Sequence, residues 1–296
     1  MSSAPVAGPT GLVVVDKEPG WTSHDVVART RSIFGQRRVG HAGTLDPDAT
    51  GVLLVGLGRV TRLLRFLTGL GKEYRAEIVL GVATDTLDAS GKVVARWDMS
   101  AVTLADARLA TARLTGRIDQ IPPMVSAVKV GGRRLHELAR QGLEVDRPAR
   151  QVHVHRFDLD ATDEPGVLAA RVECSSGTYV RTLAADLGSL LGGGAHLRAL
   201  RRTRVGSFSV AEAEPVGALG PESVRSPAEA LRDLERVVVD AACAALVALG
   251  RPLDRVPLGA TGEGPWALVD ATGRLLAVYE SSGMHAMRPA VVLVSR

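Results

Sequence analysis

The order of strand-forming and helix-forming runs is the feature that most restricts the fold of this chain. Runs rich in Val, Leu and Ile predict strands. They lie at residues 11–17, 51–58, 72–81, 90–98, 151–160 and 167–177. Amphipathic runs that end in glycine predict helices at residues 22–35, 59–71, 104–116 and 178–192. Because strands and helices do not alternate in regular βα units, we predict an α+β fold with a mixed, mainly antiparallel central sheet flanked by helices.

The chain divides near residue 235. Residues 211–235 are rich in Ala, Pro and Glu and predict a connecting segment. A short helix and three β-rich runs follow, with the turn sequence Asp-Ala-Thr-Gly-Arg between the first two runs. We therefore expect a flexible tail at residues 1–10, a main domain at 11–235 and a small β-rich domain at 236–296. A basic insert at about residues 121–150 belongs to the main domain.

Composition excludes several classes of protein. The two cysteines, Cys174 and Cys243, are far apart, which argues against a disulfide framework or a cysteine-rich zinc site and favours a reduced, cytoplasmic setting. The first ten residues lack the basic start and apolar run of a signal peptide. No apolar run reaches the roughly 18 residues of a membrane span. A net charge of +4 and a pI of about 9.4 fit an anionic partner without requiring one.

A single carboxylate stands out in the stretch GHAGTLDPDATGVLLVGLG, residues 40–58. Asp46 is followed by Pro47, which pushes the residue before it toward an extended conformation. Glycines on both sides permit sharp turns and close approach by another backbone. An isolated Asp-Pro in a glycine-rich segment is usually a plain turn, so Asp46 becomes a catalytic candidate only together with the rest of the chain.

Three further stretches carry clustered functional side chains. Tyr179 and Arg181 follow a predicted strand in VECSSGTYVRTLAADLG, and a guanidinium at that place suits a carboxylate or a phosphate. The stretch AHLRALRRTRVGSF holds Arg198, Arg201, Arg202 and Arg204. The basic insert opens with two prolines and carries Lys129, Arg133, Arg134, His136 and Arg140. Each cluster alone is also compatible with a solvated surface, and for Arg181 and the basic insert that is the more common case. His153 and His155 share a strand face without a third ligand, so we predict no metal site.

Six motifs, in order across residues 11–210, resemble the TruB family of tRNA pseudouridine synthases. They are VVVDKEPGWTSHDVV, GHAGTLDPDATGVL, KEYR, IPPMVSAVKVGGRRLHELARQG, CSSGTYVRTLAADLG and GAHLRALRRT. The resemblance implies the pseudouridine synthase fold for the main domain, and the C-terminal segment resembles a shortened PUA domain, an RNA-binding module. The chain departs from the common pattern at Glu18, which precedes Pro19, at Val125 in place of an aromatic residue and at His136 in place of a tyrosine.

The resemblance also implies roles for particular residues. Asp46 is then the catalytic aspartate, Tyr74 stacks on the target base and Arg181 pairs with Asp46. His41, Tyr179 and Leu200 fall at substrate-contact positions. The predicted RNA contacts are Lys17, Lys129, Arg140, Arg201 and Arg202.

The implied reaction converts uridine to pseudouridine in the T-loop of tRNA, at position 55. The N1–C1′ bond breaks, the base turns, and C5 joins C1′. This isomerisation is redox-neutral, so we expect no cofactor and no metal. We expect tRNA as the partner, no membrane association, and a monomer without an obligatory protein partner. Two alternatives are a non-catalytic protein that binds or remodels RNA, and a guide-RNA-dependent pseudouridine synthase.

Overall fold

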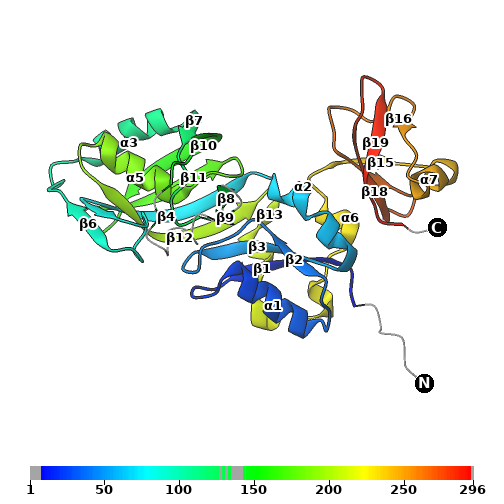
Figure 1. The fold of residues 1–296 in the computed structure, drawn as a ribbon, viewed down its shortest axis with the longest axis horizontal. Helices are drawn as coiled ribbons and strands as arrows, with labels where there is room; N and C mark the ends of the chain where they lie inside the picture. Colours follow the sequence, from blue (N-terminus) through cyan, green and yellow to red (C-terminus); the bar gives the residue numbers. More distant parts are fainter. Residues whose placement is uncertain (1–7, 127–128, 131–132, 135–142, 144, 295–296) are drawn as a thin grey trace.

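The structure, a computed structural model, describes residues 8–126, 129–130, 133–134, 143 and 145–294. Within this part of the chain, ten strands form one long sheet, whose main path runs β14-β1-β3-β12-β4-β11-β10-β7. β2 pairs with β3, and β13 pairs with β12. Their bounds, in chain order, are β1 Gly11–Lys17, β2 Val39–Ala42, β3 Thr50–Leu57, β4 Lys72–Leu80, β7 Gly116–Gln120, β10 Arg150–Ala161, β11 Val167–Cys174, β12 Ala195–Val205, β13 Phe208–Ser209 and β14 Glu214–Pro215. Figure 1 shows this sheet running through the length of the main domain.

The pairing pattern confirms a mixed, mainly antiparallel sheet. Of the neighbouring strands in this sheet, only β1 with β14 and β3 with β12 run parallel in the described chain. β1 and β3 are buried along most of their length, as expected of apolar strands covered on both faces. β4 instead alternates between buried and mostly half-buried side chains, because one face of that half of the sheet is less covered.

The strand β12 was missed in the sequence analysis, where the same residues were treated only as an arginine cluster. β12 lies in the middle of the sheet, parallel to β3 and antiparallel to β4. Its position carries Leu200, Arg201 and Arg202 into the region where the two halves of the sheet meet. The arginines of this run therefore occupy different environments, although they are neighbours in the sequence.

Helices cover the sheet and fix its ends. α1 (Ser23–Ile33) begins with a capping box between Thr22 and Asp25, and packs near β2. α3 (Leu104–Thr111) and α5 (Val180–Leu190) cover one face of β4, β10, β11 and β12, with a shared apolar core (Figure 1). The helix predicted at residues 59–71 is shorter than expected: a 3-10 turn, Gly58–Arg62, precedes α2, Leu64–Thr68. A short hairpin, β5 (Val82–Thr84) and β6 (Val93–Arg96), projects beyond β4.

A second sheet of five strands forms the C-terminal part of the described chain, in the order β15-β17-β18-β19-β16. Its elements are β15 Glu235–Val238, α7 Ala241–Ala248, β16 Leu253–Asp254, β17 Trp266–Val269, β18 Leu275–Ser281 and β19 Ala286–Val292. This β-rich unit agrees with the predicted fold class. Arg59 and Arg62 of the main domain donate hydrogen bonds to the carbonyl oxygens of Leu293 and Val292, at 2.6 and 2.7 Å.

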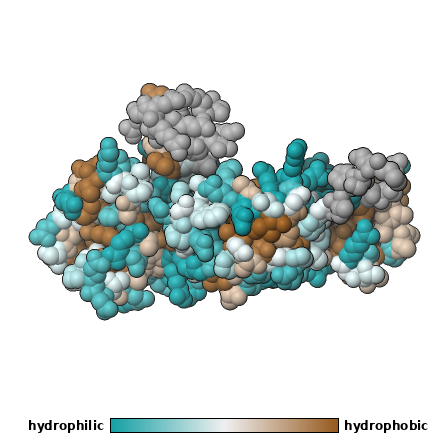
Figure 2. All heavy atoms as spheres, turned by 90° about the horizontal axis from the view of Figure 1, so that it is seen from below, coloured by the Kyte–Doolittle hydropathy of each residue, from teal (hydrophilic) through white to brown (hydrophobic). Residues whose placement is uncertain are grey.

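The surface is mixed in character. On the face drawn in Figure 2, hydrophilic residues separate the apolar patches. In the described part of the chain, no helix combines the length and the apolar character needed to cross a bilayer.

Candidate active site

The loop that carries Asp46 joins β2 to β3, and its backbone conformation requires glycine at two positions. Gly43 and Gly51 have φ angles of 84° and 101°, which strongly favour glycine. At Gly51 a Cβ atom would collide with the carbonyl oxygen of Arg202, because β3 and β12 approach closely there. The frame of glycines around Asp46 therefore lets the loop turn sharply and lie directly against the central strand.

Two buried cations hold this loop from below. The Lys17 ammonium donates hydrogen bonds to the carbonyl oxygens of Pro47, Trp21 and Glu18, at 2.8, 2.7 and 3.0 Å. The Arg202 guanidinium donates to the carbonyl oxygens of Val52, Gly43 and Thr44, at 2.7, 3.1 and 3.4 Å.

Lys17 and Arg202 are both among the predicted RNA contacts, and their burial argues against a direct contact with the RNA. Both residues are only 1% exposed, and their donors are directed at backbone carbonyls inside the protein. They act on the site by fixing the Asp46 loop.

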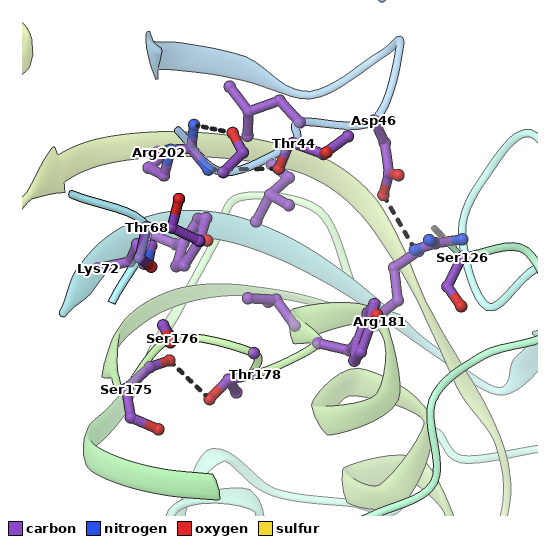
Figure 3. A pocket seen from close by; sticks show the side chains of 17 residues that line it. Thr44, Asp46, Thr68, Lys72, Ser126, Ser175, Ser176, Thr178, Arg181 and Arg202 are labelled. Carbon is purple, nitrogen blue, oxygen red and sulfur yellow. Dashed lines mark hydrogen bonds and ion pairs between the residues drawn. The ribbon is translucent and has the colours of Figure 1, made fainter. Parts of the chain in front are cut away.

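Asp46 and Arg181 form an ion pair, with 3.1 Å between Asp46 Oδ2 and Arg181 Nε (Figure 3). The arginine side chain is 5% exposed, whereas the aspartate is 45% exposed because it opens into a cavity. Burial by the surrounding protein raises the pKa of Asp46 above its usual value, and the charge of Arg181 partly offsets that rise. The pair thus presents a single carboxylate in a sheltered place, held on one side by a fixed cation.

The guanidinium of Arg181 is also held from its far side by a residue that the sequence analysis missed. Its Nη1 lies 3.2 Å from Asp88 Oδ2 and donates to the carbonyl oxygen of Thr86 at 3.1 Å, and its Nη2 donates to the carbonyl oxygen of Val125 at 2.7 Å. Asp88 lies in the turn that links β5 to β6.

The hairpin turn fixes Asp88 tightly. Its Oδ1 accepts hydrogen bonds from the Thr86 and Ser90 hydroxyls, both at 2.6 Å. Leu87, the preceding residue, has a φ of 64°, an uncommon conformation for a leucine and one that is associated with functional sites. In the sequence, the stretch DTLDASG is indistinguishable from an ordinary polar turn, so it gave no signal of an active-site acid.

Tyr179, just before α5, is positioned by a glutamine that was also missed. The Tyr179 N–H donates to Gln120 Oε1 at 3.0 Å, and Gln120 Nε2 donates to the Tyr179 carbonyl oxygen at 3.2 Å. Gln120 is 2% exposed and lies at the end of β7. It therefore caps α5 from a neighbouring strand, and this fixes the start of the helix that carries Arg181.

A cavity of about 350 Å³ opens beside the ion pair and brings most of the predicted site together. Its lining includes Asp46, Tyr74, Tyr179, Arg181 and Leu200. Burial raises the pKa of the Tyr74 phenol, so this residue is a neutral, largely apolar wall at ordinary pH. Figure 3 places Asp46 and Arg181 at one side of the cavity and Lys72 and Thr68 at the other.

The remaining predicted residues lie elsewhere. His41 is not among the residues that line the cavity; its ring lies edge-on to His24, with 5.5 Å between centroids, and burial lowers its pKa to about 4. Arg201 forms a two-pronged contact with Asp16, at 3.0 and 2.7 Å. Lys129 belongs to the short strand β8 (Lys129–Val130), and Arg140 lies outside the described residues. In the described ranges no group of three or more His, Cys, Asp and Glu side chains is placed to hold a metal ion.

Comparison with known proteins agrees with this arrangement. The chain matches the model of the TruB family pseudouridylate synthase N-terminal domain over residues 31–180, more than half of its length. The chain belongs to the TruB family. It is therefore a pseudouridine synthase, an isomerase. Residues 181–238 match the tRNA pseudouridylate synthase B C-terminal domain.

Several relatives resemble the chain over nearly its whole length. The tRNA pseudouridine synthase B of Symbiobacterium thermophilum is 52% identical over 81% of this chain and 82% of that protein. The proteins of the same name from Mycobacterium tuberculosis and an Arthrobacter species are 45% and 44% identical, covering 95% and 96% of both chains, respectively. A chain in the crystal structure of a Cbf5-Nop10-Gar1 complex has a TM-score of 0.75 and 27% identity, covering 97% of this chain and 86% of its own.

Proposed function

We propose that this chain converts the T-loop uridine of tRNA, at position 55, to pseudouridine, acting without a guide RNA or a partner protein. The observation that carries the proposal is the Asp46–Arg181 pair, which opens into a cavity walled by Tyr74. The relatives named tRNA pseudouridine synthase B, at 44–52% identity, support tRNA as the substrate. The protein is then a monomeric enzyme with a catalytic domain at residues 11–235 and a PUA-like domain at 236–296.

In this proposal Asp46 acts on the ribose of the target uridine. An ionised carboxylate can either attack C1′ or remove a ribose proton while the N1–C1′ bond breaks. Arg181 favours the ionised form of Asp46 and, because Asp88, Thr86 and Val125 hold it in turn, sets the direction of the carboxylate. After the base has turned, C5 joins C1′ and the C5 proton leaves. The product has the same atoms as the substrate, so the reaction needs no external redox partner.

Tyr74, Tyr179 and Leu200 form the walls against which the uracil ring is held. A uridine in a folded RNA loop must leave its stack to enter such a cavity, at a cost of a few kcal/mol. We propose that Tyr74 compensates part of this cost by stacking, and that His41, Lys129, Arg140 and Arg201 make further contacts with the RNA. The burial of Tyr74, at 8% exposed, means that the incoming base meets a wall already in place.

Two alternatives predict different behaviour of the purified chain. A guide-RNA-dependent enzyme requires added guide RNA and partner proteins. This reading is disfavoured because the Cbf5 complex chain is only 27% identical, against 44–52% for the relatives named tRNA pseudouridine synthase B. A non-catalytic RNA-binding protein leaves uridine unchanged. Nothing in that role requires a carboxylate, a buried arginine and a tyrosine around one cavity.

The test is to map pseudouridine in an unmodified tRNA transcript after incubation with the purified chain alone. We expect pseudouridine at the T-loop position and nowhere else in that transcript. Asp46→Asn is expected to abolish turnover, by roughly 10³-fold or more, while tRNA binding persists. Product formation only after addition of guide RNA, or near-normal turnover by Asp46→Asn, would contradict the proposal.

A further inference from the structure

The side of the cavity opposite Asp46 is positively charged, and the proposed roles of Asp46, Arg181 and Tyr74 do not explain why. Lys72, at the start of β4, lines this side and is 8% exposed (Figure 3). Arg202 lines it as well and is 1% exposed. In the described part of the chain neither residue has an acidic side chain within ion-pair distance. The thiol of Cys174 near Lys72 stays neutral, because burial raises its pKa to about 11.

Lys72 keeps one donor that no residue in the described part of the chain accepts. Its ammonium donates to the carbonyl oxygens of Thr68 and Leu70, both at 2.6 Å. These two bonds satisfy two of its three N–H groups and leave the third for the cavity. Burial and the neighbouring Arg202 lower the pKa of Lys72 to about 8, so the ammonium predominates at neutral pH and gains from an approaching negative charge.

The adjoining wall adds further donors. Ser176, Gly177 and Thr178 line the same cavity, in the loop before α5. The backbone N–H groups of Ser176 and Gly177 donate no hydrogen bond to a residue that the structure describes. Buried cations and free donors around an enclosed space are the arrangement that stabilises charge developing on a bound group.

We propose that Lys72 stabilises the negative charge that the uracil ring acquires when the N1–C1′ bond breaks. This inference rests on the proposed function and adds a leaving-group role to the same cavity. With C1′ held at Asp46, a ring that extends across the cavity brings its carbonyl edge toward the side where Lys72 lies. The third N–H of Lys72 then donates to a ring carbonyl oxygen. The positive charge of Arg202 adds to the positive potential at this side of the cavity.

The electron count shows why a cation is needed at that place. As the N1–C1′ bond breaks, its electron pair stays on N1 and spreads over the ring carbonyl oxygens, giving a uracil anion. The positive charge that this leaves on the ribose is balanced by Asp46. Asp46 either bonds to C1′ through a carboxylate oxygen or accepts the 2′ proton. When C5 bonds to C1′, either the bond between C1′ and the carboxylate oxygen breaks or Asp46 returns the 2′ proton to the ribose. The C5–H proton is then released, and N1 gains a proton. The ring is anionic only after the N1–C1′ bond breaks and before the C5–C1′ bond forms. Lys72 therefore stabilises the ring during this stage of the reaction.

The experiment compares Lys72→Met with the unaltered chain on two transcripts, one with uridine and one with 5-fluorouridine at the target position. Fluorine stabilises the uracil anion by withdrawing electrons, so this base needs less help from the protein to leave. Single-turnover rates of N-glycoside loss are measured at saturating protein. We expect Lys72→Met to lower the uridine rate by about 10²-fold, the usual scale for removing one such donor. The loss on 5-fluorouridine should be at least about threefold smaller.

Lys17→Met is the matched control, because Lys17 is also a buried lysine that donates to backbone carbonyls but does not line the cavity. It should lower both rates by the same factor. Because the ratio of the two substrates is measured within one variant, partial unfolding cancels from the comparison. An equal loss on both substrates in Lys72→Met, or a uridine rate within about threefold of the unaltered chain, would overturn the inference. Failure of the unaltered chain to form pseudouridine would instead refute the proposed function.

Discussion

Replacing Arg181 with lysine separates charge from geometry at the Asp46–Arg181 ion pair. The guanidinium uses three nitrogens for four acceptors: Nε contacts Asp46, Nη1 contacts Asp88 and the Thr86 carbonyl, and Nη2 donates to the Val125 carbonyl. A lysine offers one nitrogen at the end of a flexible chain. It can take the place of Nη1 or of Nε, but it cannot take both, so the charge survives while the contact to Asp46 or the contact to Asp88 is lost.

The expected loss follows from these contacts. A hydrogen bond to a charged group contributes about 1.5–3 kcal/mol, which corresponds to roughly 10- to 150-fold in rate if the bond is needed in the transition state. If the carboxylate is no longer held against the ribose, its misplacement lowers the rate by about 10²-fold. These two estimates describe the same lost contact and are not added, so we expect Arg181→Lys to be slower by about 10²-fold.

The assay is single-turnover pseudouridine formation at saturating protein, with Arg181→Ala as the reference for complete loss. Urea unfolding of each variant checks that the buried site still folds, because Arg181 is only 4% exposed. If Arg181 serves only to keep Asp46 ionised, lysine restores most of the activity. A folded lysine variant within a few-fold of the unaltered chain would refute the positioning argument, and an equally active alanine variant would remove Arg181 from the site.

Three further outcomes are expected. Arg202→Met should lower the free energy of unfolding by roughly 3 kcal/mol or more, because several carbonyls lose a buried donor. Arg201→Met should leave stability nearly unchanged and reduce the salt slope of tRNA binding by about one unit. Equal loss of stability of the two variants in urea unfolding would contradict this difference. The single-turnover rate should fall as pH drops through the raised pKa of Asp46, because the carboxylate must be ionised, and should fall again above about pH 8 as Lys72 loses its proton. The upper decline should vanish in Lys72→Met, and its persistence would assign it to another group. Activity should persist in excess EDTA, since the isomerisation is redox-neutral, and a requirement for added metal in a chelator titration would reject that view.

The pairing of Asp46 with Arg181 was predicted from the resemblance to the TruB family, because each residue lies in one of the matching motifs. Asp46 is framed by glycines and a proline, and Arg181 follows a strand that ends in small polar residues. Asp88 was not predictable in this way, although it contacts the same guanidinium at 3.2 Å. Its role depends on a turn that brings residue 88 beside residue 181, and a polar turn has the same composition wherever it lies in the fold.

The arginine run shows a different limit. Arg201 and Arg202 are neighbours in the sequence, and the density of charge around them suggested one basic surface. In a strand, successive side chains point to opposite faces, so once β12 is known the two residues must differ. Arg201 reaches Asp16 at the surface, while Arg202 is enclosed beneath the Asp46 loop. β12 itself was not predicted, because a run of four arginines in seven residues does not resemble a central strand.

The partners of the buried cations explain how they serve the reaction as well as the fold. Lys17, Lys72 and Arg202 direct their donors mainly at backbone carbonyl oxygens. Carboxylate partners would reduce the cost of burying each cation, but they would also cancel its charge. Carbonyl dipoles satisfy the N–H groups and leave the net positive charge in place. The charge of Lys17 favours the ionised form of Asp46, against the burial that raises the pKa of Asp46, and in the proposal above the charge of Lys72 meets the departing uracil anion. The same contacts that fix the loop therefore keep the cavity electropositive, and replacing them with ion pairs would preserve the fold while weakening the chemistry.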